Sequence, residues 1–312
     1  MKNRTIFLFT MVAALMTLPS LTLFADDDND DNEDSRFSAE IFWAKGHDHD
    51  RHARPRAATD SSPNLSWHGG NIMSSVQVTP IFWGPNWGSA DFTNDKMTGL
   101  RTFYMDIGNS RYAHTSDEYT VANGVVTDTI TYVQNFMDVS PAPSRGNRVS
   151  PILAEVCKLI QSPSANGYYP VYVDRPRGSA GFCAWHSAGY CGATPVQFAF
   201  FFNLDGDPGC DPEDKSSGHS QGLAALANVS GHELSEALTD PRLNAWYDSS
   251  GAENADKCAW SFGTSLLSFS NNSHSNNSQW KIQGNWSNKA FNAGTGYPNT
   301  RGQNGCIDGN QK

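Results

Sequence analysis

The sequence predicts an α+β protein in which a mixed sheet packs against helices in a single globular domain. Residues 63–312 are rich in tryptophan, phenylalanine and glycine, and they are numerous enough to bury a core of their own. Strand-like and helix-like stretches follow one another there without the strict alternation of a parallel βαβ fold. All six cysteines lie in the same region, which indicates a disulfide-containing domain.

Apolar runs predict the strands. The run at 76–83 (VQVTPIFW) contains Pro80, which places this strand at an edge or a bulge because proline has no N–H to donate. The runs at 168–173 (YYPVYV) and 196–202 (VQFAFFF) have strand length and no polar alternation, which indicates burial on both faces. A short strand is expected at 280–283, within a tail rich in asparagine, serine and glycine.

Helices are predicted by periodicity and by their end signals. Residues 95–106 form the first helix, and residues 125–138 fit a helix or a strand equally. Ser150 followed by Pro151 has the pattern of an N-cap with proline at the first helical position, and it opens a helix that runs through Leu159. A third helix, described below with its motif, occupies residues 222–239.

The N-terminal part of the chain has the features of an exported protein. Residues 1–25 combine a short positive start with an apolar run and a small residue before an acidic tract, which is typical of a secretory signal peptide; an uncleaved anchor is the alternative. Residues 26–62 are acidic and then histidine-rich, which predicts a disordered linker. We therefore expect a secreted protein, extracellular or periplasmic, whose mature chain is not stably inserted in a membrane.

Charge limits the classes of partner that the protein could bind, and the cysteines limit the disulfides that it could form. Loss of the signal peptide would take the formal net charge from −10 to −12, and no basic patch occurs, which argues against a nucleic-acid partner. Six cysteines allow fifteen pairings, among which the sequence does not choose. We favour Cys183–Cys191, because it closes a short loop, and Cys258–Cys306, because it would fix the C-terminus.

The most informative stretch is the H-E-x-x-E sequence formed by residues 232–236. It differs by one residue from the H-E-x-x-H signature of zinc peptidases, in which two side chains four apart on a helix bind the metal. His232 and Glu236 lie on one helical face, and Glu233 would be the general base. Only eight glutamates occur in the chain, so the motif arises by chance with a probability on the order of 1%. The Ala/Leu-rich run before it predicts a buried helix that ends before Asp240-Pro241.

A third ligand is expected after this helix. The candidates are Glu253, Asp256 and Asp248, and we favour the first two; His186, in the Cys-bracketed loop before the motif, is a further candidate. The predicted metal is zinc, with manganese or calcium as alternatives, since a carboxylate at the second position favours a harder ion. The competing interpretation is a histidine at the edge of the core with its glutamates on a solvated face.

Two other features, one with a histidine and one with a serine, are weaker indications of a functional site. His219 would lie at the far end of the motif helix, so it is not expected to bind the metal. The pentapeptide 218–222 (GHSQG) has the letters of a serine-hydrolase nucleophile elbow, but a polar loop separates it from the preceding strand.

Several segments resemble the EXORDIUM/phosphate-induced protein family in its bacterial branch. They are HGGNIMSSVQVTPIFWG (68–84), FCAWHS (182–187), NVSGHELSEALTDPRLNAWYD (228–248) and ENADKC (253–258). The resemblance implies a secreted or cell-wall-associated protein, and it implies no specific reaction, since the biochemical activity of that family is not established.

The residues together predict an exported zincin-like metal-dependent hydrolase, a peptidase acting on a peptide or on a cell-wall or surface polymer. In this hypothesis His232, Glu236 and Glu253 or Asp256 bind zinc, and Glu233 removes a proton from water. The alternative is a non-catalytic extracellular or cell-surface binding protein of the EXORDIUM type, with or without a structural metal site.

Overall fold

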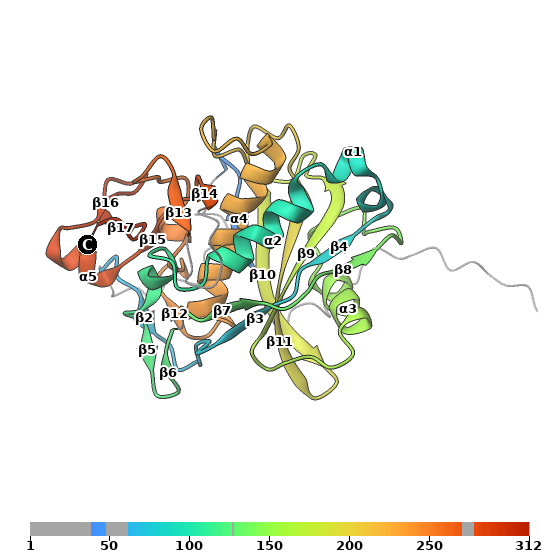
Figure 1. Ribbon diagram of the computed structural model, residues 1–312. Coiled ribbons are helices and arrows are strands. Elements are labelled where there is room, and N and C mark those ends of the chain that lie inside the picture. Colours follow the sequence, from blue (N-terminus) through green and yellow to red (C-terminus); the bar gives the residue numbers. More distant parts are fainter. Residues whose placement is uncertain (1–38, 48–61, 127, 270–277, 312) are drawn as a thin grey trace, which may run out of the picture.

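A computed structural model describes residues 39–47, 62–126, 128–269 and 278–311 of the chain. They form one α+β domain in which a mixed sheet packs against helices, as predicted (Figure 1). The expected signal peptide and most of the expected linker lie outside these residues. Within them, no helix combines the length and the apolar character that a membrane span requires.

The main sheet has eight strands in the order β1-β10-β11-β9-β3-β7, and β4 pairs with both β9 and β8. Strands β1, β10 and β11 are antiparallel neighbours, whereas β11, β9, β3/β4 and β7/β8 pair in parallel. Their bounds are β1 (Glu40–Trp43), β3 (Val76–Val78), β4 (Ile81–Trp83), β7 (Ile130–Tyr132), β8 (Phe136–Asp138), β9 (Gly167–Pro176), β10 (Phe182–Cys191) and β11 (Thr194–Asn203).

The structure confirms some of the predicted strands and corrects others. The runs at 168–173 and 196–202 are confirmed as the centres of β9 and β11, which are buried along most of their length. The run at 76–83 is divided at Thr79-Pro80 into β3 and β4, in keeping with the missing N–H of proline. The ambiguous stretch 125–138 contains strands β7 and β8. The strand expected at 280–283 is wrong except at Trp280, where β14 ends.

Helices cover both faces of the sheet. The helices are α1 (Ala90–Thr93), α2 (Lys96–Asp106), α3 (Val149–Leu159), α4 (Gln221–Thr239) and α5 (Asn288–Ala293). On α3, Leu153 lies against Gly189 of β10, whereas α4 packs on the opposite face, toward which His186 of β10 points. The N-cap of α3 is Arg148 and not the predicted Ser150, so this helix begins two residues earlier than expected.

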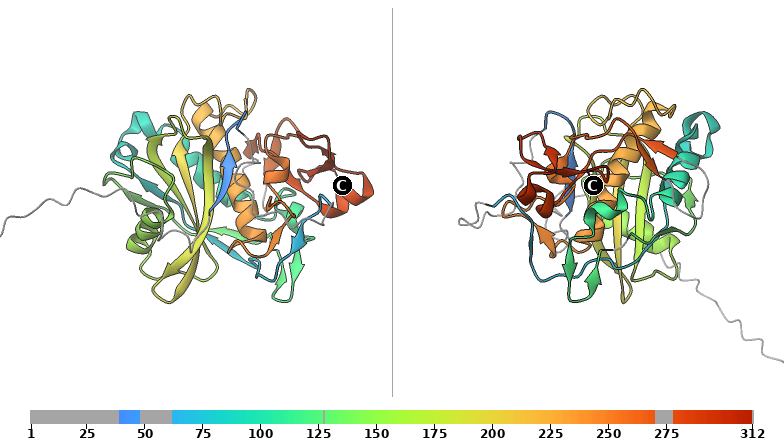
Figure 2. Two further views of the ribbon diagram at one scale, coloured as in Figure 1. Left: turned by 180° about the vertical axis from the view of Figure 1, so that it is seen from behind. Right: turned by 60° about the vertical axis from the view of Figure 1, so that its left-hand side comes forward.

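The C-terminal part of the chain forms a second layer over α4 (Figures 1 and 2). Its small sheets are β12-β2, β13-β14 and β15-β17-β16, and β5 pairs with β6 nearby. Every residue of α4 after Gln221 is therefore buried. The bounds are β2 (Ser66–Trp67), β5 (Thr120–Val121), β6 (Gly124–Val125), β12 (Trp246–Tyr247), β13 (Leu267–Phe269), β14 (Ser278–Trp280), β15 (Asn285–Trp286), β16 (Tyr297–Pro298) and β17 (Asn304–Ile307).

Part of the segment expected to be a disordered linker is ordered, which corrects the prediction for 26–62. Glu40–Trp43 forms β1, the edge strand of the main sheet, and pairs with Phe182–His186 of β10. Phe42 is fully buried there. The acidic and arginine-rich stretches on either side misled the prediction, because a four-residue strand adds too few apolar residues to change their average composition.

Three disulfides are present: Cys157–Cys191, Cys183–Cys210 and Cys258–Cys306. The predicted Cys258–Cys306 pair is confirmed. The predicted Cys183–Cys191 pair is wrong, because both residues lie on β10. Eight steps along a strand separate two Cα atoms by about 26 Å, whereas a disulfide requires about 4.4–6.8 Å.

Candidate metal centre

Helix α4 carries the H-E-x-x-E motif in its last two turns. Ser220 caps the helix by accepting a hydrogen bond from the Leu223 N–H, and it donates one to Asp95, which explains the GHSQG pentapeptide without a nucleophilic role. His232 and Glu236 lie one turn apart as predicted, with Nε2 of the histidine 3.0 Å from Oε1 of the glutamate. Both side chains are fully buried because α4 is enclosed between two layers.

Strand β10 brings a second histidine to the motif. His186 Nε2 lies 3.5 Å from Glu236 Oε2 and 3.5 Å from Glu253 Oε2. Its cross-strand neighbour on β11 is Ala199, whose small side chain leaves room on this face of the sheet. The sequence suggested His186 only as an additional ligand in a loop, whereas the structure places it on a central part of a ten-residue strand.

The chain after α4 returns two acidic residues to the same place. The Asp256 N–H donates to Glu236 Oε1 at 2.9 Å, and the Glu253 N–H donates to Asp256 Oδ2 at 3.1 Å. The disulfide of Cys258 lies directly after this turn and ties it to β17. Glu253 and Asp256 thus reach the motif as the sequence predicted, over a connection fixed by backbone hydrogen bonds.

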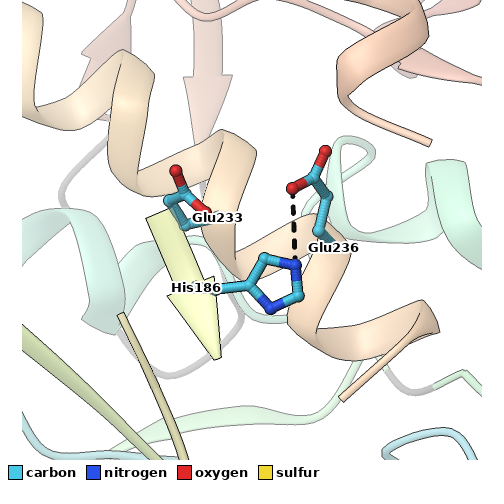
Figure 3. A group of neighbouring side chains, drawn as sticks. All are labelled: His186, Glu233 and Glu236. Carbon is cyan, nitrogen blue, oxygen red and sulfur yellow. Dashed lines mark ion pairs between the residues drawn. The ribbon is translucent and has the colours of Figure 1, made fainter. Parts of the chain in front are cut away.

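The side chains form two overlapping groups that could each hold a cation. One consists of His186, Glu233 and Glu236, and the other of His232, Glu236 and Asp256; in each, one ligand atom per residue lies within 4.8 Å of the others. Figure 3 shows the first group, with the two glutamates projecting from α4 and the histidine from β10 toward a shared space. Glu236 belongs to both groups, because its two oxygens face different histidines.

Hydrogen bonds of Gln283 decide between the two histidines. Its Oε1 accepts from the Trp260 N–H at 3.2 Å, and its Nε2 donates to the Ala255 carbonyl at 2.9 Å, so the amide orientation is fixed. The same Nε2 lies 3.0 Å from His232 Nδ1. An amide nitrogen can only donate, so Nδ1 accepts and the single proton of neutral His232 sits on Nε2. His232 then has no lone pair at Nε2 for a metal, and this N–H meets no acceptor in hydrogen-bonding geometry.

The distances around His186 suit a tetrahedral ion. Two ligand atoms, each about 2.05 Å from such an ion, are about 3.4 Å apart. The two 3.5 Å separations from His186 Nε2 to Glu236 and Glu253 match that edge, whereas His232 Nε2 lies closer to Glu236, at 3.0 Å. His186 and Glu236 are therefore the favoured ligands. Glu253, which is near His186 but belongs to neither group, is the candidate third ligand, and the Asp256 N–H holds Glu236 in place.

The electrostatics of the cluster disfavour ionised carboxyl groups in the absence of a cation. Burial raises the pKa of Glu233, Glu236 and Glu253 well above the usual value, and the neighbouring carboxylates raise it further. No lysine or arginine of the described residues contributes to these shifts, and Lys257 pairs with Asp248 instead. Both carboxylate oxygens of Glu233 and of Glu253 are buried without a hydrogen-bond partner. Such groups are costly unless protonated or bound to a cation.

His232 contributes as a neutral donor. Desolvation in the protein interior lowers its pKa to about 4, although Asp256 and Gln283 act in the opposite direction. Its ring is stacked on Phe42 of β1, with centroids 3.9 Å apart. A neutral imidazole 3.0 Å from Glu236 adds no positive charge beside that carboxyl group.

Two of the residues considered from the sequence lie elsewhere. Asp248 accepts from Lys257 at 2.6 Å and is not part of either group. His219 stacks on Trp280 just before the start of α4, far along the helix from the motif. No protein-family model matches the chain, and no curated protein matches it either.

Proposed function

We propose that the cluster binds one divalent transition-metal ion through His186, Glu236 and Glu253, and that the protein is an exported metal-dependent hydrolase. The observation that carries the proposal is the pair of 3.5 Å distances from His186 Nε2 to two glutamate oxygens, one of them on the otherwise unsatisfied Glu253. One imidazole with carboxylates suits zinc or manganese, and calcium is disfavoured because it requires six to eight oxygens.

The proposed reaction is hydrolysis, with a peptide as substrate. A divalent cation lowers the pKa of water toward 7, and Glu233 is placed within 4.8 Å of the His186 and Glu236 ligand atoms to accept the proton. Burial raises the pKa of Glu233, which suits a group that takes up a proton near neutral pH. In this proposal the helix resembles that of zincins, but the histidine ligand comes from the sheet.

A structural metal site is the second candidate, because His186, Glu236 and Glu253 are at most 1% exposed. The ion would then stabilise the fold of a cell-surface binding protein, as the resemblance to the EXORDIUM family suggests. Three disulfides fit either candidate, since both place the protein in an oxidising compartment. The two differ in whether the metal-loaded protein hydrolyses any peptide.

The test begins with metal content. Purified protein is stripped with a chelator, reloaded with zinc or manganese and analysed by mass spectrometry, and we expect one ion per chain. His186→Gln should abolish retention, whereas His232→Gln should weaken affinity about 10- to 100-fold, as expected for a residue behind a ligand. His219→Gln is the control. Retention by the first variant and complete loss by the second would place the metal at His232 and refute the assignment.

Catalysis is tested separately on a library of quenched fluorescent peptides. Glu233→Gln should keep one ion per chain and lose hydrolysis, because it removes the proton acceptor. A wild-type protein that binds metal stoichiometrically and cleaves no peptide favours the structural site. Substoichiometric metal in the wild type would sink both candidates.

A further inference from the structure

The edge strand β1 lies directly over the metal cluster. It pairs antiparallel with β10, so that Glu40 is opposite His186. Figure 2, in the view from behind, shows this short blue strand at the edge of the sheet, next to α4. Directly opposed residues of an antiparallel pair project to the same face, which here is the face of α4. A segment distant in sequence from the other strands thus closes the site.

Two alternate residues of β1 contact the site. Phe42 is fully buried and stacks on the ring of His232. Glu40, two residues earlier and therefore on the same face, adds a negative charge that raises the pKa of Glu233, Glu236 and Glu253. A cation bound among these carboxyl groups would turn the repulsion of Glu40 into an attraction.

The rest of the contact is made mainly by the backbone. Of the four β1 residues only Phe42 is buried, and the pairing with β10 shifts register after it. The next two residues, Ala44 and Lys45, donate backbone hydrogen bonds to Gly181 and Gly209. Backbone pairing along a sheet edge with one enclosed side chain is how proteins recognise extended peptides.

We propose that the edge of β10 beside the cluster is a binding site for an extended polypeptide, and that residues 39–47 occupy this site in the intact chain. The proposal rests on the proposed function, because the bound strand has to pass over the metal. The preferred ligand is a strand with an aromatic side chain at the position of Phe42, and a carboxylate two residues before it adds affinity when metal is present.

The test frees the segment without removing it. A recognition sequence for a site-specific protease is inserted after Ala57, and the purified protein is cut under native conditions. We expect the N-terminal fragment to dissociate on gel filtration while circular dichroism stays unchanged. A fluorescent peptide of residues 39–47 should then bind the cut protein saturably, and at least tenfold more weakly to the uncut protein.

Peptide variants probe the two side chains. Phe42→Ala in the peptide should weaken binding at least tenfold, whereas Ile41→Ala, on the other face, should change it less than threefold. Glu40→Gln should weaken binding in zinc, and in chelator it should strengthen binding because it removes a like charge. A fragment that stays bound through gel filtration, or a protein that unfolds when the fragment leaves, would show that β1 is a permanent part of the sheet and overturn the proposal.

The proposed function can fail independently. A cut protein that binds the peptide but holds no metal keeps the peptide site and refutes the metal site. A protein that holds one ion per chain but never releases the fragment keeps the metal site and refutes the peptide site.

Discussion

Replacing Glu236 with glutamine is predicted to have opposite effects on stability with and without metal. In the structure, Glu236 Oε1 accepts from the Asp256 N–H and lies 3.0 Å from His232 Nε2, while Oε2 faces His186 at 3.5 Å. Glutamine retains one oxygen for the Asp256 N–H, so this hydrogen bond survives. It replaces the second oxygen with an amide nitrogen, which cannot bind a cation.

The expected magnitudes follow from these contacts. Without metal, the substitution removes a buried carboxyl whose pKa burial and its acidic neighbours raise, so we expect a gain of about 1–3 kcal/mol in the free energy of unfolding at pH values near 8. With metal at about 1,000 times its Kd, the wild type gains about 4 kcal/mol. The variant lacks a ligand and should gain less than about 1 kcal/mol.

Urea unfolding followed by tryptophan fluorescence measures both differences. The curves are recorded near pH 8 in chelator and in zinc, and the free energies are compared at a common slope. Glu155→Gln is the matched control, because Glu155 is also buried and has a raised pKa but pairs with Lys158. It should change the free energy of unfolding by the same amount in both conditions. If Glu236→Gln also changes it by the same amount in both conditions, no metal binds at this residue.

Three further predictions concern the rest of the molecule. In chelator, the midpoint temperature of thermal unfolding should fall as the pH rises from about 5 to about 8, because carboxyl groups with raised pKa values in the folded state keep protons that the unfolded chain has released. Zinc should flatten this slope, and a midpoint temperature that rises with pH would contradict the prediction. Replacing Cys258 and Cys306 with serine should lower the free energy of unfolding by about 4 kcal/mol through loop entropy, and it should also weaken metal retention. Removing the disulfide between α3 and β10 should leave metal retention unchanged in the same mass-spectrometric assay. Lys96→Met should destabilise by about 1–3 kcal/mol in urea, since it leaves Asp205 without its buried cationic partner; an unchanged midpoint would show that the pair contributes nothing.

The sequence predicted the helix and the acidic turn of the site because their signals are local. An Ala/Leu-rich run, a hydroxyl cap and a closing Asp-Pro define α4, which places Glu233 and Glu236 by helical geometry alone. The apolar runs at 168–173 and 196–202 likewise became β9 and β11, where continuous burial agrees with composition. In these elements, local preference and tertiary environment favour the same structure.

The proposed histidine ligand was not predictable in this way. Strand β10 contains glycine, serine and alanine, so its sequence has no strong strand pattern, and only its pairing between β1 and β11 makes it a strand. His186 therefore looked like a loop residue. Whether His232 binds a metal depends on Gln283, which is 51 residues away and whose amide orientation is set by two backbone groups. Such long-range hydrogen bonds leave no periodic signal.

The position of β1 also has a consequence for solubility. On the side of β10 the main sheet ends at this four-residue strand. The remaining residues of β10, from Ser187 to Cys191, pair with β11 on one side and have no strand on the other side among the described residues. An uncovered edge is a template for pairing with another chain. A copy that lost β1 would expose nearly the whole of β10, so two such copies could join edge to edge into a continuous sheet. The segment over the site therefore also protects the protein from self-association.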